Sequence, residues 1–136
     1  MSLFDSYSRE QLRDMYSQAW RKHLAGMPMT PLEAMIADVV GLHPEYHATL
    51  DAGEAADGNA FLHMGLHMAV REQLSIDRPP GVRELRRQLE SRLGGAHAAE
   101  HVLVEALGET LWEAQRAGRP PDEGHYLTLA QRRLPR

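Results

Sequence analysis

The chain has 136 residues, of which 43% are hydrophobic and 25% charged, a composition typical of one globular domain and not of a disordered chain. Fifteen Lys and Arg against 19 Asp and Glu give a formal net charge of −4, which argues against a nucleic-acid partner. The absence of cysteine excludes disulfides, thiolate metal ligands and thiol nucleophiles.

No stretch of the sequence predicts a signal peptide or a membrane span. Residues 1–13 are polar and contain no apolar stretch of signal-peptide length. The longest apolar run, residues 60–70, is interrupted by two histidines and is too short to span a bilayer. We therefore expect a cytoplasmic protein with no membrane partner.

The first two predicted helices begin at capping signals. Ser8 precedes Gln11 by three residues, which is the capping-box spacing. Thr30 precedes Glu33 in the same way, and Pro31 occupies the first turn that proline favours. Glycine and proline then predict the ends of these helices near residues 26 and 41.

The rest of the chain is predicted to be helical as well, because apolar residues recur at helical spacing between Gly and Pro breaks. The predicted ranges are 44–50 for a short helix, then 59–76, 82–93, 96–117 and 122–134, with a loop over 51–58. No stretch alternates in the way that strands do, and no internal repeat is present. These patterns predict an all-α fold, a single-domain helical bundle of about five to six helices over residues 1–136.

Six of the eight histidines fall into three pairs with four-residue spacing: His43 and His47, His63 and His67, and His97 and His101. Random placement would give about 0.4 such pairs in a chain of this composition. Residues i and i+4 are neighbours on one helix face, so two imidazoles with this spacing can reach one metal ion. The pattern therefore predicts metal ligands.

Helical-wheel positions refine this prediction. His63 and His67 continue the apolar stripe of their helix. Glu100 falls in the apolar face of the helix that carries His97 and His101, about 60° from His97. A buried carboxylate is costly unless a cation or a metal pairs with it, which makes Glu100 a further candidate ligand. His43 extends an apolar stripe too, although Pro44 leaves the direction of its side chain open.

The leading hypothesis is a transition metal bound between facing helices. The candidate ligands are His43, His47, His63, His67, His97, Glu100 and His101. Nitrogen-rich ligation suits Zn, Ni, Fe or Cu better than Mg or Ca. One alternative is a small metal-dependent hydrolase with Glu100 as base, because residues 97–101 read H-x-x-E-H. The others are a metal-free protein-interaction module with neutral, hydrogen-bonded core histidines, and a pH-responsive core. The protein partner or small-molecule substrate and self-association into a homo-oligomer stay open.

Several short motifs resemble one family over nearly the whole chain. They are Trp20-Arg21-Lys22, Pro31-Leu32-Glu33, His43-Pro44-Glu45-Tyr46-His47, Phe61-Leu62-His63 with Gly65-Leu66-His67, Arg71-Glu72-Gln73, and Trp112-Glu113-Ala114-Gln115 with Gly118-Arg119-Pro120-Pro121. The family is an uncharacterised proteobacterial one, domain of unknown function 1841. This chain departs from it at Ala60, where the family has proline, and in a shorter loop before the third long helix. The resemblance implies no established activity.

Overall fold

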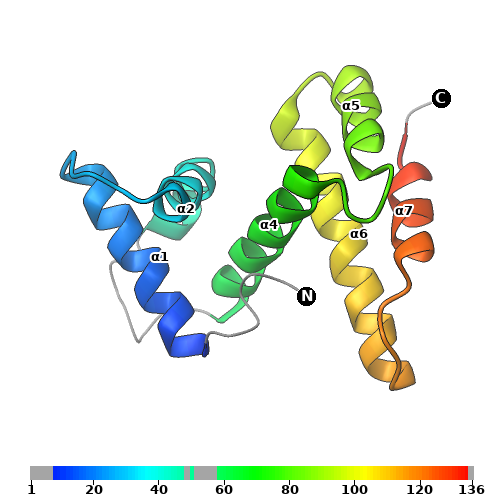
Figure 1. Ribbon diagram of the computed structural model, residues 1–136, viewed down its shortest axis with the longest axis horizontal. Helices are drawn as coiled ribbons and strands as arrows, with labels where there is room; N and C mark the ends of the chain where they lie inside the picture. Colours follow the sequence, from blue (N-terminus) through cyan, green and yellow to red (C-terminus); the bar gives the residue numbers. More distant parts are fainter. Residues whose placement is uncertain (1–7, 48–49, 51–57, 135–136) are drawn as a thin grey trace. The chain divides into compact units, whose positions relative to one another are not determined.

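The computed structural model describes residues 8–47, 50 and 58–134, and the chain divides into two compact units, Met1–Met68 and Ala69–Arg136 (Figure 1). The helices are α1 (Arg9–Leu24), α2 (Pro31–Gly41), the 3₁₀ helix η1 (Pro44–Tyr46), α4 (Gly58–Ile76), α5 (Val82–Leu93), α6 (Ala96–Ala117) and α7 (Glu123–Gln131). The described residues contain no strand, which confirms the all-α prediction. The expectation that residues 1–136 form one folding domain stays a prediction.

Local signals set the helix ends where they were expected. The Ser8 hydroxyl accepts a hydrogen bond from the Gln11 backbone N–H at 3.1 Å, and the Gln11 side chain accepts one from the Ser8 N–H at 2.8 Å. Thr30 and Glu33 form the same reciprocal pair at 3.1 and 2.9 Å. These bonds satisfy N–H groups that the first turn of a helix leaves without intrahelical partners.

The helix bounds agree with the predicted ranges except at the end of α7, in residues 44–50 and at the start of α4. Helices α5 and α6 have the predicted bounds, and α7 begins after its N-cap Asp122 but ends at Gln131, before the predicted residue 134. The predicted helix 44–50 begins as the three-residue helix η1, and residues 48–49 lie outside the described residues. The predicted loop lies outside them at residues 51–57, while its last residue, Gly58, begins α4.

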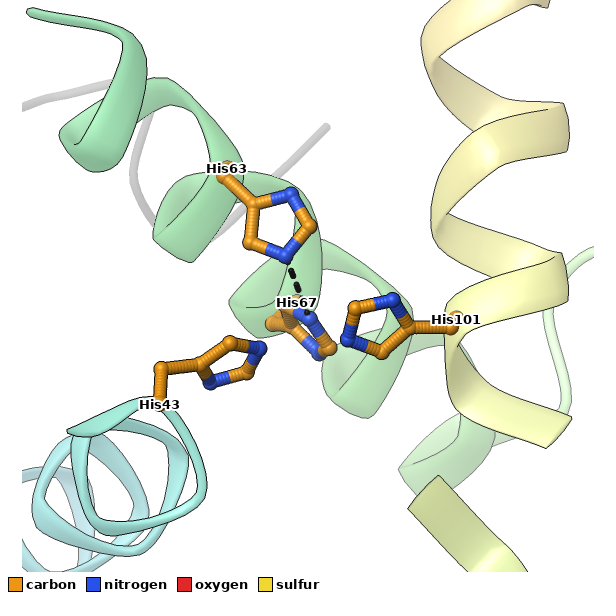
Figure 2. Close-up of side chains that lie close together, drawn as sticks. All are labelled: His43, His63, His67 and His101. Atoms are coloured by element: carbon orange, nitrogen blue, oxygen red, sulfur yellow. Dashed lines mark hydrogen bonds between the residues drawn. The ribbon is translucent and has the colours of Figure 1, made fainter. Parts of the chain in front are cut away.

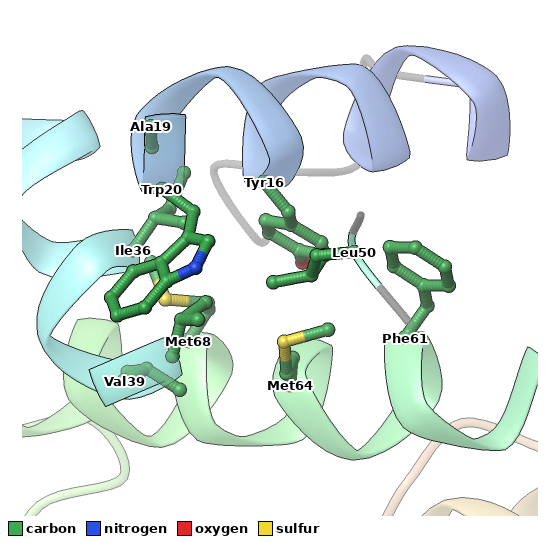
Figure 3. Packing of buried hydrophobic residues seen from close by; sticks show 10 residues of the cluster. Tyr16, Ala19, Trp20, Ile36, Val39, Leu50, Phe61, Met64 and Met68 are labelled. Atoms are coloured by element: carbon green, nitrogen blue, oxygen red, sulfur yellow. The ribbon is translucent and has the colours of Figure 1, made fainter. Parts of the chain in front are cut away.

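The first unit has an apolar core between α1, α2 and the part of α4 up to Met68 (Figure 3). Tyr16 of α1 stacks on Phe61 of α4 with ring centroids 6.0 Å apart. Met64 and Met68 follow Phe61 at helical spacing and are both 1% exposed. Burying one apolar face of each helix in this way supplies most of the driving force for folding.

The second unit is organised around α6, which packs against α5 and α7. Leu103 and Leu107 of α6 and Leu89 of α5 belong to its buried apolar side chains. Polar contacts fix its outer elements: the Tyr126 hydroxyl donates to Gln73 Oε1 at 2.6 Å, and His125 Nε2 lies 2.6 Å from a carboxylate oxygen of Glu113. No helix in the described part of the chain combines the length and the apolar character that a membrane span requires.

Candidate metal site

Three histidines of the first unit come together from two segments of the chain. His43 follows α2, while His63 and His67 lie one turn apart on α4, and the rings of His43 and His63 point toward His67 (Figure 2). One ring nitrogen from each lies within 4.8 Å of the others. His43 and His67 are 1% and 0% exposed, and His63 is partly exposed. We call these three residues the histidine group of the first unit.

A backbone hydrogen bond fixes the tautomer of His43. Its Nδ1 lies 2.7 Å from the Val39 carbonyl oxygen, four residues earlier in α2. A carbonyl oxygen can only accept, so Nδ1 carries the proton and donates it. The lone pair of the neutral ring is then on Nε2. A hydrogen bond from the second ring nitrogen to a carbonyl is also the arrangement that orients histidines at metal centres.

His63 and His67 make a direct contact between their Nε2 atoms, which lie 3.1 Å apart. A hydrogen bond of this kind needs one donor and one acceptor, so one of the two nitrogens carries a proton that both share. Two nitrogens bound tetrahedrally to one zinc ion at the usual bond length lie about 3.3 Å apart. A metal ion could therefore take the place of the shared proton with little movement of either ring.

The three rings also touch one another through their faces and edges. The His43 ring centroid lies 4.4 Å from that of His67 and 5.1 Å from that of His63, in both cases nearly edge to face. No Asp or Glu of the described part of the first unit belongs to the group. The group therefore offers neutral nitrogen donors alone, which transition metals prefer and Mg²⁺ and Ca²⁺ do not.

His47, a fourth predicted ligand in the first unit, lies outside this group. Its Nε2 donates to the Val40 carbonyl oxygen at 3.0 Å, and its ring stacks on Trp20 with centroids 4.4 Å apart. The Val40 carbonyl thus binds one ring nitrogen of His47, and the Trp20 indole covers one face of its ring. The i, i+4 spacing of His43 and His47 does not bring their rings together, because α2 ends at Gly41 and the residues between the two histidines form the 3₁₀ helix η1.

The second unit contains the other predicted ligands, His97, Glu100 and His101, all on α6 (His101 is also drawn in Figure 2). The rings of His97 and His101 contact each other, with centroids 4.4 Å apart. Glu100 is 6% exposed, as its place on the apolar face predicted. Its carboxylate accepts hydrogen bonds from Arg71 Nε at 2.8 Å and from Arg71 Nη2 at 3.4 Å. An arginine therefore supplies the cation that a buried carboxylate requires.

Two residues that contact candidate ligands were not among the predicted site residues. Arg71 follows His67 by four positions, so the spacing that identified the histidine pairs could also have identified it. Tyr46 packs against both His43 and His63, with ring centroids 5.5 and 5.8 Å away. Its place in the motif His43-Pro44-Glu45-Tyr46-His47 was visible in the sequence, but its contact with His63 depends on the fold.

Comparison with known proteins gives the family and nothing finer. No curated protein and no solved structure matches the chain. The model of a family described as a domain of unknown function, DUF1841, matches residues 8–132, which is nearly the whole chain. The match covers both compact units and includes the histidine group. The chain belongs to the DUF1841 family.

Proposed function

We propose that this protein binds a transition-metal ion through His43, His63 and His67. One observation carries the proposal: imidazoles from two separate segments converge, with a nitrogen of each within 4.8 Å of the others. The hydrogen bond from His43 Nδ1 to Val39 strengthens the proposal because it leaves Nε2 as the donor atom.

The donor set favours Zn²⁺, Ni²⁺, Fe²⁺ or Cu²⁺, because neutral imidazole nitrogen binds these ions more strongly than it binds Mg²⁺ or Ca²⁺. Zinc is the reference case, since three protein ligands and one further position are typical of its catalytic sites. Hydrolysis by a metal-bound water is the reaction that such a site would support.

The first test is the metal content of protein made without a polyhistidine tag in metal-replete medium. We expect near-stoichiometric metal in the wild-type chain and a marked loss in His67→Ala. The matched control is His125→Ala, which removes a histidine of the second unit that contacts Glu113. Wild-type protein with less than about a tenth of an equivalent of metal would contradict the proposal, since a resident ion copurifies with the folded state.

The second test uses thermal stability. Bound metal stabilises the folded state only, so a chelator should lower the melting temperature of wild-type protein. The same chelator should leave the melting temperature of His67→Ala unchanged, because that variant holds no metal to lose. Equal melting curves for wild-type protein with and without chelator favour the metal-free alternative, in which His63 and His67 share a proton.

From the sequence pattern we further propose that His97, His101 and Glu100 of the second unit also take part in metal binding. Metal analysis of His97→Ala, Glu100→Gln and His101→Ala separates the outcomes. A lower metal content in any of these variants supports a role for the second unit. Unchanged content in all three restricts the ligands to the histidine group of the first unit.

A further inference from the structure

Tyr46 lies against two of the three histidines in the group. Its ring is stacked on that of His43 at 18° with centroids 5.5 Å apart, and is tilted at 57° to that of His63 with centroids 5.8 Å apart. His43 and His63 are themselves in edge contact. The three rings therefore form a mutually contacting set, in which Tyr46 touches one histidine from each of the two segments that build the site.

The sequence His43-Pro44-Glu45-Tyr46 explains how Tyr46 reaches this place. Pro44 cannot continue α2 and starts the 3₁₀ helix η1, in which the Tyr46 N–H donates to the His43 carbonyl at 3.0 Å. The turn therefore brings Tyr46 back toward His43, and the phenol ring stacks on the imidazole.

Metal binding would remove the hydrogen bond that now orients His63. Its Nε2 shares a proton with His67 Nε2, and that proton must move to the Nδ1 of its ring or to solvent before both Nε2 atoms can bind an ion. The ring contacts of His63 with Tyr46 and His43 are contacts between whole rings and do not depend on this hydrogen bond. Tyr46 is thus placed to keep His63 facing His67 in both states.

We infer that Tyr46 is a positioning residue of the metal site, which holds the rings of His43 and His63 in the orientation that binding requires. This inference rests on the proposed metal function. The two ring contacts carry this role, so loss of the ring should weaken binding more than loss of the hydroxyl. Two ring contacts of ordinary strength correspond to a change of about tenfold in metal affinity.

The experiment uses the full chain and Co²⁺, whose visible absorption reports the geometry of its ligands. The dissociation constant is measured by competition with a chelator, and the spectrum is recorded at saturation. We expect Tyr46→Phe to match wild-type protein within about twofold, because it keeps the ring. We expect Tyr46→Leu to bind Co²⁺ about tenfold more weakly and with an altered spectrum.

The matched control is Phe61→Leu, which removes another stacked ring of the first unit, the partner of Tyr16, and leaves the histidine group intact. A general loss of packing would lower the melting temperature of both variants, while only Tyr46→Leu should change the Co²⁺ spectrum. If Tyr46→Leu does not fold, as judged by circular dichroism, Pro44→Gly replaces it. This variant keeps Tyr46 but loosens η1, and weaker Co²⁺ binding is again the expected result.

Unchanged Co²⁺ affinity and spectrum in Tyr46→Leu, or in Pro44→Gly where that variant replaces it, would overturn the inference while the metal site itself stands. Wild-type protein that fails to bind Co²⁺ and every other metal tested would overturn both the inference and the proposed function. A Tyr46→Phe variant as weak as Tyr46→Leu would show that the hydroxyl does the work, which also contradicts a role through ring packing.

Discussion

The guanidinium of Arg71 contacts both carboxylate oxygens of Glu100 through two donors, Nε at 2.8 Å and Nη2 at 3.4 Å. The two side chains are 22% and 8% exposed. Replacing one partner of a largely buried ion pair is costly, because it leaves the other charge in a poorly solvated place without that counter-ion. We expect Arg71→Met to lower the free energy of unfolding by about 3 kcal/mol, measured by urea denaturation.

An exposed pair offers a control for this prediction. Arg87 also donates through two nitrogens, Nε and Nη2, to the carboxylate of Glu84, but its side chain is 69% exposed. Surface ion pairs contribute little, so Arg87→Met should leave the free energy of unfolding nearly unchanged. If Arg71→Met costs no more than Arg87→Met, burial does not make the Arg71–Glu100 pair important for stability.

His47 is expected to contribute to stability more than to metal binding, because it donates to Val40 and stacks on Trp20. Loss of the hydrogen bond and the ring contact in His47→Ala should lower the free energy of unfolding by about 2 kcal/mol. His47→Phe keeps the ring and should recover about half of this loss. Metal content should be unchanged in both. A variant that loses metal and keeps its stability would instead support His47 as a ligand.

Tyr16 makes stability depend on alkaline pH. Burial raises the pKa of its phenol from 10.0 to about 12, because the charged phenolate is poorly solvated in the core. Between these two values the unfolded chain has lost the proton and the folded chain keeps it, so stability falls as pH rises. Below pH 10 the contribution is fully present.

Unfolding free energies of wild-type protein and Tyr16→Phe, measured across that pH window, check this expectation. The variant has no phenol at position 16, so its stability should fall less steeply with rising pH. Tyr126, whose pKa burial also raises, remains in both proteins and supplies a shared background. Parallel curves for the two proteins would show that Tyr16 ionises as readily in the folded state as in the unfolded one.

Glu33 should have the opposite effect at acid pH. Its pKa is lowered from the ordinary value of 4.5, first by the hydrogen bond from Lys22 and then by the backbone N–H of Thr30. A lowered pKa contributes stability above the ordinary value of the carboxyl group, and this contribution is lost as pH falls through the lowered value. Removing the carboxylate should therefore lower stability at neutral pH and leave it unchanged in acid.

Glu33→Gln tests this expectation by thermal melting at a series of pH values. It should melt below wild-type protein at neutral pH and approach it once Glu33 is protonated. Lys22→Met should show part of the effect, because the Thr30 N–H still donates to the carboxylate. Lys22 of α1 and Glu33 of α2 form an ion pair. A constant difference in melting temperature between Glu33→Gln and wild-type protein at all pH values would mean that the charge of Glu33 does not contribute to stability.

The helix bounds of this protein follow from signals that act within a few residues. Thr30, Pro31 and Glu33 begin α2 where the capping pattern predicted, since the bonds that satisfy the first turn come from neighbours in sequence. Gly94 and Gly118 end α5 and α6 with φ of 79° and 65°, a left-handed conformation that glycine adopts without strain. Such features need no tertiary contact to be recognised.

The partners of the predicted site residues did not follow from the sequence in the same way. Spacing predicted that His63 and His67 share a face of one helix, and they do. It could not decide that His43 joins them while His47 turns to Trp20, because a four-residue spacing has this meaning only inside an unbroken helix and η1 intervenes. Nor could it decide that Glu100 pairs with Arg71, which lies 29 positions earlier in the chain.

The amino-acid order alone thus determined the all-α fold, most of the helix bounds and the histidine pairs as candidates for metal binding. Tertiary structure decided which imidazoles converge and which polar groups satisfy one another. The physical reason is the range of the interactions: capping and helical periodicity act over one or two turns, whereas side-chain contacts depend on how separate helices pack.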